Sequence, residues 1–415
     1  METPSPVVWL ENPRAAETHS SESVARYMPA TSTTEARKYH LQMPGYRMTP
    51  LKGLTRLANM LGIGGIWVKD EAERFGLGSF KVLGGSFAIF RYIRDRLGNP
   101  TPFSHADLAR DEVRKILKGL TFAAATDGNH GRGVAWAARQ LGTESVIYVH
   151  ERTSPSRIHA IEEAGARVVV VPGTYDDAVR QVSKDATENH WQVISDTSWP
   201  GYEDIPAWVM QGYATLFLEV QQQMVALGDL RPTHVFVQAG VGSLAAAAAA
   251  FYANLYRNAR PKIVVVEPER AACLYASLEA NDGQPRSFPG DLDTIMAGLA
   301  CGDPNPIAWQ ILRDTADIFL KCPDYVAGKG MRVLGMPLAG DPTVISGESG
   351  AVTLGALMFV LRREEYRPLR ERLGLNHNSQ VLLVNTERNT DPDHFRQVVW
   401  DGAASVPVAY RESYL

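Results

Sequence analysis

Short apolar runs alternate with longer amphipathic or alanine-rich segments along the chain from Leu51 onward. Runs of β-branched residues bounded by Gly, Pro, Asn or Asp are typical of buried strands, whereas apolar residues at helical spacing are typical of helices. The pattern predicts strands at residues 66–69, 121–125, 145–149, 167–171, 193–195, 234–238, 263–267 and 381–385. It predicts helices at residues 84–97, 131–141, 156–164, 175–189, 208–227 and 242–257.

Strand, turn and helix recur in the same order, which predicts an α/β fold with doubly wound, mostly parallel sheets. Ligands of such sheets bind beyond the carboxyl ends of the strands, and the glycine-rich motifs of this chain fall at those ends. Residues 1 to about 50 are instead rich in Pro, Thr, Ser and Glu. We expect this segment to form an arm that packs on a neighbouring subunit.

The composition of the chain limits the classes of protein to which it can belong. Of the 415 residues, 45% are hydrophobic and 21% charged, which is ordinary for a globular protein. The sequence has no apolar run long enough for a membrane span and no secretory signal, so we expect a soluble, cytoplasmic protein. The 42 basic and 46 acidic side chains form no basic block, which argues against nucleic acid as a partner.

Three cysteines, Cys273, Cys301 and Cys322, lack the CxxC spacing of a zinc site. We therefore expect no metal site and interpret the three residues as buried free thiols. Cys273 and Cys301 bracket a loop rich in Gly and Pro, and the sequence leaves open whether the two ever pair.

The segment Phe75–Gly85, FGLGSFKVLGG, places one lysine among glycines and small residues directly after a predicted strand. A buried ammonium needs a partner, and the flanking glycines leave room for a ligand to approach the backbone. Lys81 is therefore a candidate for a nucleophilic amine that forms Schiff bases. For this segment alone, a lysine that reaches solvent from a helix start is the plainer interpretation.

Two further motifs lie at strand-to-helix turns. In TDGNHGRG, Thr126–Gly133, Asn129 can offer a donor and an acceptor to a ligand, or a polar residue of the turn can simply cap the helix. In AGVGSL, Ala239–Leu244, exposed amides and the Ser243 hydroxyl can hold one phosphate group. Close packing of a helix on a strand explains those glycines as readily.

A last motif, NTERNTD, follows the predicted strand VLLV and places Thr386 at its end. A lysine nucleophile, an asparagine turn, a cup for one phosphate and a hydroxyl at a late strand end together meet the needs of pyridoxal 5'-phosphate (PLP). The set is far more specific than any of its members.

Four segments, VKDEAERFGLGSFKVLGG, TDGNHGRGVAWAARQLG, AGVGSLA and SGESGAVTLG, resemble the fold-type II PLP enzymes and, among them, the diaminopropionate ammonia-lyase family. The likeness runs from about Tyr46 to about Trp400. It implies a homodimer with PLP in a cleft between a large and a small domain. We expect an arm at 1–45, a large domain at 46–94 and 216–415, and a small domain at 95–215.

The resemblance also implies roles for particular residues. Lys81 would form the Schiff base with PLP, Asn129 would contact its 3-hydroxyl, and Thr386 would meet the pyridine nitrogen through a neutral hydroxyl. The phosphate would be held by the loop Gly240, Val241, Gly242, Ser243 and Leu244. The family usually reads Thr-Glu-Gly where this chain has Arg388 third, which puts the geometry of that loop in doubt.

Asp127 discriminates among the related enzymes, because serine and threonine dehydratases carry a serine in its place. A carboxylate there would repel the substrate carboxylate, so we expect it to attract a second substrate ammonium or to remove a proton. We assign Lys81 as the base for the L-isomer and Asp127 as the base for the opposite, D-isomer face. Asp196, in VISDTSW, matches another acidic position of the family and either assists or caps a turn.

The implied reaction is the α,β-elimination of D- and L-2,3-diaminopropionate, a small amino acid, to pyruvate and two molecules of ammonia. A lyase that acts on serine, threonine or hydroxyaspartate is the alternative within the same chemistry. A PLP-binding protein without catalysis is the alternative from another class. The physiological substrate, the isomer preference, the pathway and the extent of domain closure stay open at this stage.

Overall fold

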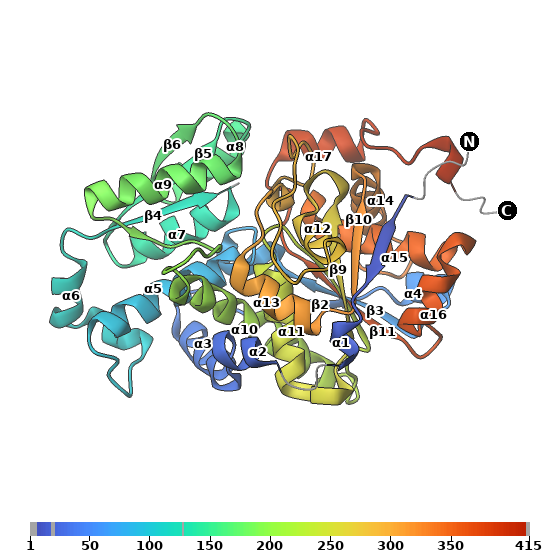
Figure 1. Ribbon diagram of the computed structural model, residues 1–415, viewed down its shortest axis with the longest axis horizontal. Helices are drawn as coiled ribbons and strands as arrows, with labels where there is room; N and C mark the ends of the chain where they lie inside the picture. Colours follow the sequence, from blue (N-terminus) through green and yellow to red (C-terminus); the bar gives the residue numbers. More distant parts are fainter. Residues whose placement is uncertain (1–5, 18–20, 127, 412–415) are drawn as a thin grey trace.

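The computed structural model describes residues 6–17, 21–126 and 128–411. Two sheets organise the molecule, one of seven strands and one of four (Figure 1). The four-stranded sheet and its helices form the lobe drawn in green and cyan, beside the larger lobe. The expected α/β fold with two mostly parallel sheets is therefore confirmed.

The seven-stranded sheet has the order β1-β10-β9-β8-β11-β3-β2. Its central strands are parallel, and only the two edge strands, β1 and β2, run antiparallel to their neighbours. A strand that is covered on both faces carries a continuous apolar run, as in HVFVQ of β8, whose five residues are all buried. The strands are β1 (Val8–Glu11), β2 (Leu51–Gly53), β3 (Gly65–Asp70), β8 (His234–Gln238), β9 (Lys262–Pro268), β10 (Ile318–Cys322) and β11 (Gln380–Asn385).

The four-stranded sheet has the order β6-β5-β4-β7, and all its pairings are parallel. Helices α7 and α9 pack on β4 and β5. Its strands are β4 (Thr121–Thr126), β5 (Glu144–His150), β6 (Arg167–Val171) and β7 (Gln192–Val193).

The helices fill the connections between strands and cover the sheets. They are α1 (Arg14–Glu17), α2 (Glu22–Tyr27), α3 (Ala30–Gln42), α4 (Thr55–Leu61), α5 (Lys81–Arg96), α6 (Asp111–Leu117), α7 (Asn129–Gln140), α8 (Pro155–Glu163), α9 (Tyr175–Asn189), α10 (Asp204–Ala226), α11 (Ser243–Tyr256), α12 (Cys273–Glu279), α13 (Pro306–Thr315), α14 (Asp324–Gly335), α15 (Glu348–Arg362), α16 (Arg367–Leu373) and α17 (Pro392–Val399). Each predicted strand and helix overlaps an observed one.

Three strands escaped the sequence prediction. β1 and β2 are short edge strands, and β10 lies between β1 and β9. β10, IFLKC, carries Lys321 in a run of only five residues, which weakens its apolar signal. Short edge strands are defined by the neighbour that pairs with them more than by their own residues.

The described part of the first 45 residues packs on its own chain, and the expected contact of this arm with a neighbouring subunit stays a prediction. This part adds β1 to the large sheet and packs α3 against α10 of the same chain. Ala36 and His40 on α3 are fully buried, and the His40 ring bonds Thr215 and the carbonyl of Leu83. Small and polar residues at helical spacing form this buried face, in a segment whose composition had suggested an arm and no core element. The predicted boundaries at 94/95 and 215/216 fall inside α5 and α10, respectively.

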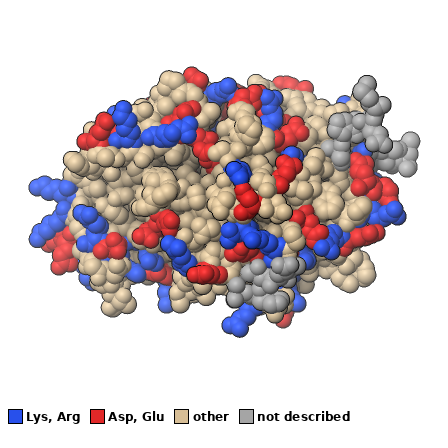
Figure 2. All heavy atoms as spheres, in the orientation of Figure 1, with Lys and Arg blue, Asp and Glu red and all other residues tan. Residues whose placement is uncertain are grey.

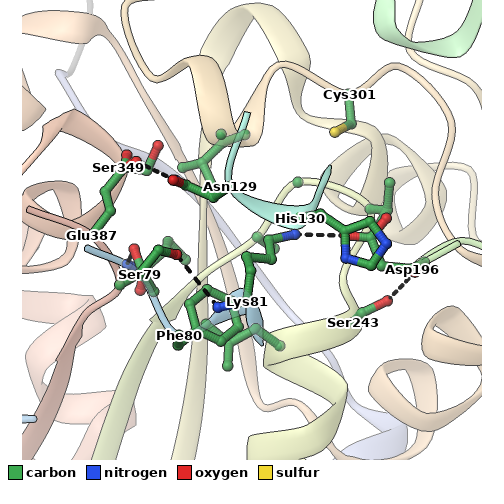
Figure 3. A pocket seen from close by; sticks show the side chains of 18 of the residues that line it. Ser79, Phe80, Lys81, Asn129, His130, Asp196, Ser243, Cys301, Ser349 and Glu387 are labelled. Atoms are coloured by element: carbon green, nitrogen blue, oxygen red, sulfur yellow. Dashed lines mark hydrogen bonds and ion pairs between the residues drawn. The ribbon is translucent and has the colours of Figure 1, made fainter. Parts of the chain in front are cut away.

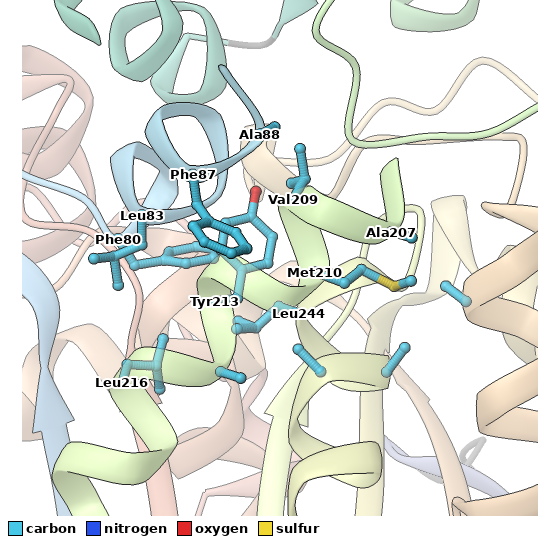
Figure 4. Close-up of a cluster of buried hydrophobic side chains, with 14 of the residues drawn as sticks. Phe80, Leu83, Phe87, Ala88, Ala207, Val209, Met210, Tyr213, Leu216 and Leu244 are labelled. Atoms are coloured by element: carbon cyan, nitrogen blue, oxygen red, sulfur yellow. The ribbon is translucent and has the colours of Figure 1, made fainter. Parts of the chain in front are cut away.

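Helices α5 and α10 meet at unusually close range, and this contact fixes the start of α5 (Figure 4). A Cβ atom added to Gly84 would lie 2.5 Å from the Tyr213 ring, and one added to Gly212 would lie 2.4 Å from the carbonyl oxygen of Leu83. Phe80 and Phe87 pack around the same Tyr213 in the buried cluster. Since α5 begins at Lys81, the packing that holds α5 also holds that lysine.

Basic and acidic side chains are interspersed on the face drawn in Figure 2. No helix within residues 6–17, 21–126 and 128–411 combines the length and the apolar character that a membrane crossing needs. Those ranges also contain no group of His, Cys, Asp and Glu side chains suited to a metal ion.

Candidate active site

Lys81 opens helix α5 and lines a pocket at the carboxyl ends of the large sheet (Figure 3). The loop before it is tied to the end of β11: the Phe80 amide donates to the Thr386 carbonyl at 3.3 Å, and Ser79 forms a β-bridge with Glu387. The lysine and the Thr386 segment therefore reach the pocket as one unit, although they are far apart in the sequence.

Asp196 is the observed partner of the lysine. Lys81 Nζ donates to Asp196 Oδ2 at 2.6 Å, with the Lys81 side chain 19% exposed and that of Asp196 5% exposed. Tyr175, the first residue of α9, donates its hydroxyl to Asp196 Oδ1 at 3.0 Å. Burial alone would raise the pKa of Asp196, but the Lys81 and His130 charges and the hydrogen bonds from Lys81 and Tyr175 bring it below its usual range. The carboxylate is thus charged when it meets the lysine.

Two side chains on the large-sheet side of the pocket fix the backbone of Asp196. Ser243 Oγ donates to the Asp196 carbonyl at 2.6 Å, and Asn305 Nδ2 reaches the same carbonyl at 3.1 Å. Asn305 Nδ2 also donates to Ser243 Oγ at 2.9 Å. The Ser243 hydroxyl that the sequence assigned to phosphate therefore also positions Asp196.

The glycine loop joins β8 to α11, so the amides at the N-terminus of α11 face the pocket. Gly242 has φ +100°, a conformation that favours glycine. A Cβ atom on Gly240 would lie 3.0 Å from Cys301 Sγ and 3.2 Å from Leu299 Cα. Larger residues at either position would close or distort the loop.

Thr386 lies where the pocket meets the end of β11 and is buried. Gln238 Nε2 donates to Thr386 Oγ1 at 2.9 Å and to the Val384 carbonyl at 3.0 Å. Because Thr386 Oγ1 accepts from Gln238, its own proton can be donated to a group in the pocket. Gln238, which the sequence had not singled out, sets this orientation.

Asn129 is the first residue of α7, after Gly128 with φ +143°. Thr126 Oγ1 stabilises this turn by accepting from the amides of Gly128 and Gly131 at 2.8 and 3.0 Å. Asn129 Nδ2 donates to Glu387 Oε2 at 2.6 Å, so the asparagine turn of the small sheet touches the last strand of the large one. Asp127, the predicted base, lies outside the described residues.

Arg388, where the family pattern has glycine, leaves the neighbouring backbone intact. Its amide donates to the Gly78 carbonyl at 2.9 Å. Its side chain covers Gly78, with Cγ and Cδ 3.0 Å from a Cβ atom placed there, and lies 3.7 Å from Glu73 Oε1. The arginine therefore packs on the outside of the lysine loop and is itself half exposed.

Comparisons with known proteins agree with this geometry. A family model described as pyridoxal-phosphate dependent enzyme matches residues 42–386. Diaminopropionate ammonia-lyase of Escherichia coli K12 is 46% identical over 89% of this chain and 92% of its own length. The chain belongs to this PLP-dependent family.

Solved structures of the family support the same assignment. The holo diaminopropionate ammonia-lyase of Escherichia coli has a TM-score of 0.87 and 42% identity, covering 97% of this chain and 98% of that one. The same enzyme in complex with an aminoacrylate-PLP azomethine reaction intermediate has a TM-score of 0.84 and 42% identity, with the same coverage. The fold-type II architecture and the PLP cofactor expected from the sequence are therefore confirmed.

The family residues named from the sequence, apart from Asp127, line one pocket. Tyr175, Gln238, Asn305 and Glu387 were missed. Gln238 adjoins the motif AGVGSL and Glu387 lies within the motif NTERNTD, and those positions were their only sequence signal. Tyr175 and Asn305 carry no motif, and only tertiary contacts reveal them.

A buried ionic cluster behind the lysine loop was also missed. Lys69 of β3, Arg74 of the 3-10 helix η1 (Glu71–Gly76) and Glu219 of α10 have side chains with no exposed area. Glu219 Oε2 accepts from Lys69 Nζ at 2.6 Å and from Arg74 Nη2 at 2.8 Å. Arg74 precedes the FGLGSFK segment directly, so the cluster anchors the chain that delivers Lys81.

All three cysteines are buried, and no disulfide joins them within the described residues. Cys273 Sγ lies 3.6 Å from the Gly240 carbonyl oxygen, and burial raises the pKa of the Cys273 thiol. Since Cys301 also lies beside Gly240, both thiols flank the glycine loop.

Glu348 opens α15 and bonds His394 Nδ1 at 2.5 Å.

Proposed function

We propose that this enzyme catalyses the PLP-dependent α,β-elimination of D- and L-2,3-diaminopropionate to pyruvate and two molecules of ammonia. The convergence of Lys81 with the Asp196 carboxylate in the cofactor pocket carries the proposal. The Asp196 carboxylate, which is fixed beside the Lys81 amine, suits a substrate with a second ammonium group because opposite charges attract. The relatives, which are diaminopropionate ammonia-lyases, support the same substrate.

The residues present fit the cofactor. Gly240 leaves room beside Cys301 and Leu299 that a Cβ atom would fill, Gly242 supplies the φ of +100° that the turn needs, and the α11 N-terminus directs its amides to the pocket. We assign phosphate binding to Gly240, Val241, Gly242, Ser243 and Leu244. We assign the 3-hydroxyl contact to Asn129, the ring-nitrogen contact to Thr386, and the covalent linkage to Lys81.

PLP supplies an electron-accepting ring that stabilises the charge left at Cα when a proton is lost. Lys81 Nζ removes that proton from the L-isomer once the substrate has displaced the lysine. Asp196 Oδ2 then holds the protonated amine, because a charged carboxylate 2.6 Å away favours the ammonium form. Tyr175 keeps the carboxylate in this orientation through Oδ1.

For the D-isomer the proton points to the opposite face, and we assign its removal to Asp127. This assignment rests on the carboxylate that replaces the dehydratase serine in the sequence. Thr386 offers the ring nitrogen a neutral hydroxyl, which favours rapid loss of the β-amino group over a long-lived charge at Cα.

A substrate panel tests the proposal. Purified holoenzyme is assayed with D- and L-diaminopropionate, serine, threonine and hydroxyaspartate, with product identification as pyruvate or another oxoacid. Turnover of diaminopropionate above the hydroxy amino acids supports the proposed function. Faster turnover of serine or threonine would establish the dehydratase alternative, and absence of turnover with bound PLP would establish the non-catalytic one.

We further propose a cytoplasmic homodimer with the large and small domains expected from the sequence, whose junctions at 94/95 and 215/216 lie within helices α5 and α10. The exposed side chains of Met336, Leu338 and Ile345 support a second copy as partner. They lie in a segment that reaches β2, where Lys52 Nζ donates to the Thr343 carbonyl at 2.9 Å. Sedimentation velocity of the wild type and of Met336→Glu tests this, since a dimer interface here predicts dissociation of the variant.

A further inference from the structure

One buried side chain, Asn305, joins the glycine loop to the segment that carries Asp196. Asn305 is fully buried and is the N-cap of α13, where its Oδ1 accepts from the Ile307 amide at 3.2 Å. Pro304 and Pro306 flank it, and proline limits both its own backbone and that of the residue before it. Asn305 is therefore held in one place at the start of a helix that packs on α11.

Both ends of the Asn305 side-chain amide are fully engaged. Nδ2 donates to Ser243 Oγ at 2.9 Å and to the Asp196 carbonyl at 3.1 Å. Oδ1 accepts from Ser198 Oγ at 2.7 Å as well as from the helix amide. The amide cannot be turned over, because Oδ1 would then face a carbonyl oxygen and Nδ2 would face an N–H group. The backbone amide adds a bond to the Val241 carbonyl at 2.8 Å, so Asn305 contacts the glycine loop twice.

The Ser243 hydroxyl has one proton and two groups that can accept it. In this structure it donates to the Asp196 carbonyl at 2.6 Å (Figure 3). Under the proposed function the same hydroxyl also contacts the cofactor phosphate, and one proton cannot serve both acceptors. When Ser243 turns to the phosphate, Asn305 Nδ2 still donates to the Asp196 carbonyl. A buried carbonyl that loses its donors is costly, and Asn305 prevents that loss.

We propose that Asn305 is a positioning residue that couples the glycine loop to the Lys81–Asp196 pair. By holding the Asp196 carbonyl, it lets Ser243 donate to the phosphate while the Asp196 carboxylate stays 2.6 Å from Lys81 Nζ. The coupling is reciprocal, so the same side chain strengthens cofactor retention. The inference rests on the phosphate contact assigned to Ser243 under the proposed function and is independent of the substrate.

Asn305→Ser tests the proposal, because it removes both Nδ2 bonds and keeps a hydroxyl that caps α13 as well as asparagine does. In this variant the Ser243 proton reaches the phosphate only by leaving the Asp196 carbonyl unpaired. We therefore expect the PLP dissociation constant to rise about tenfold. Dialysis of the holoenzyme against known PLP concentrations, followed by the visible band of the cofactor linkage, measures it.

Asn12→Ser is the matched control. Asn12 is 2% exposed and lies at the other end of α13, where its Nδ2 donates to the carbonyls of Arg313 and Ala316 at 2.8 and 2.7 Å. The variant therefore loses the same kind of bonds to the same helix, and neither of those carbonyls belongs to a residue that lines the cofactor pocket. Its PLP dissociation constant should stay within about twofold of the wild-type value.

A double-variant cycle tests the route through the serine hydroxyl. In a Ser243→Ala background there is no proton to redirect, so Asn305→Ser should change the PLP dissociation constant by less than about twofold. An equal rise in both backgrounds, or a rise in Asn12→Ser as large as in Asn305→Ser, would overturn the proposal. Asn305→Asp is the second variant if Asn305→Ser does not fold, since it keeps the volume and the cap, replaces the donors by an acceptor and should weaken PLP retention at least as much.

The position of Asp196 has a spectroscopic readout of its own. A carboxylate beside the Lys81 nitrogen favours the protonated form of that nitrogen. Loss of both donors to the Asp196 carbonyl should therefore lower the pH midpoint of the visible band by about 0.5–1 unit in Asn305→Ser and leave it unchanged in Asn12→Ser. An unchanged midpoint in Asn305→Ser would overturn the coupling.

Failure of the proposed function is distinguishable from failure of this inference. The dissociation constant and the pH midpoint need bound PLP but no turnover, so a different substrate leaves both measurements intact. An unchanged PLP dissociation constant in Ser243→Ala alone would refute the phosphate contact of Ser243, and the inference would fall with it.

Discussion

Glu219→Gln removes the carboxylate at the centre of the buried cluster behind the lysine loop. In the wild type, Glu219 accepts from Lys69 at 2.6 Å and from two nitrogens of Arg74, each at 2.8 Å. The glutamine amide retains the shape but has one acceptor oxygen and brings an NH2 group toward cationic donors. Lys69 then keeps only neutral acceptors, the Thr49 carbonyl and Gln223 Oε1.

The expected loss follows from complete burial. Breaking a buried ion pair on one side costs about 3–5 kcal/mol; here the Lys69 ammonium stays buried with neutral acceptors alone, while Arg74 keeps its two bonds to Glu71. Lys69→Met should cost less, about 1–3 kcal/mol, since Glu219 keeps both Arg74 contacts. The prediction that Glu219→Gln loses more free energy of unfolding than Lys69→Met is therefore sharper than either value alone.

Urea unfolding of the holoenzyme, followed by circular dichroism and by the visible absorbance of PLP, measures both effects. With a urea dependence of at least about 3 kcal/mol per molar for a chain of this size, Glu219→Gln should lower the midpoint by roughly 1 M. Glu188→Gln, on the exposed side of α9, is the matched control and should change the free energy of unfolding by less than about 0.5 kcal/mol. A loss in Glu219→Gln no larger than in Lys69→Met would refute the reasoning.

The same variant has a defined pH dependence. Burial would raise the pKa of Glu219, but the hydrogen bonds and charges of Arg74 and Lys69 lower it below its usual 4.5. A carboxyl group with a lowered folded-state pKa stabilises the protein above its unfolded pKa and loses that contribution as pH falls through the folded value. The stability gap between wild type and Glu219→Gln should therefore be full at pH 7 and narrow below about pH 4.5.

The remaining predictions concern the site. Lys81→Ala should abolish the visible band of the cofactor linkage, and a band that survives dialysis would contradict the lysine assignment. Asp127→Asn should reduce turnover of D-diaminopropionate at least about tenfold more than that of the L-isomer, whereas equal losses would remove its face-specific role. Gly242→Val should weaken PLP retention, because φ +100° strains a β-branched residue, and unchanged PLP affinity would count against the phosphate loop. Burial and the charge of Asp303 raise the pKa of Asp176 to about 6 in the folded protein. The ionised Asp176 therefore destabilises the fold increasingly as pH rises from 3.8 through that value. Asp176→Asn should add about 1–2 kcal/mol to the free energy of unfolding at pH 8 and little at pH 4.

Local pattern located eight of the eleven strands and six of the seventeen helices of the described residues. β9 and α9 were located from their own residues, because β-branched runs and helical spacing are properties of adjacent positions. Strands β1 and β2 were missed because an edge strand depends on the neighbour that pairs with it. Helix α3 was missed because its buried face holds small and polar residues, Ser32 and Thr33 among them, in a segment whose composition predicted an arm.

The sequence by itself determined the fold class and the cofactor and singled out the candidate lysine, because these depend on short motifs whose glycines and polar residues are contiguous. Only the tertiary structure decided which groups serve those motifs. Lys81 and Asp196 are 115 residues apart and meet at 2.6 Å, and Asn129 and Glu387 are 258 residues apart and meet at the same distance. Such pairs form where the ends of two separate sheets converge, and no local spacing records that convergence.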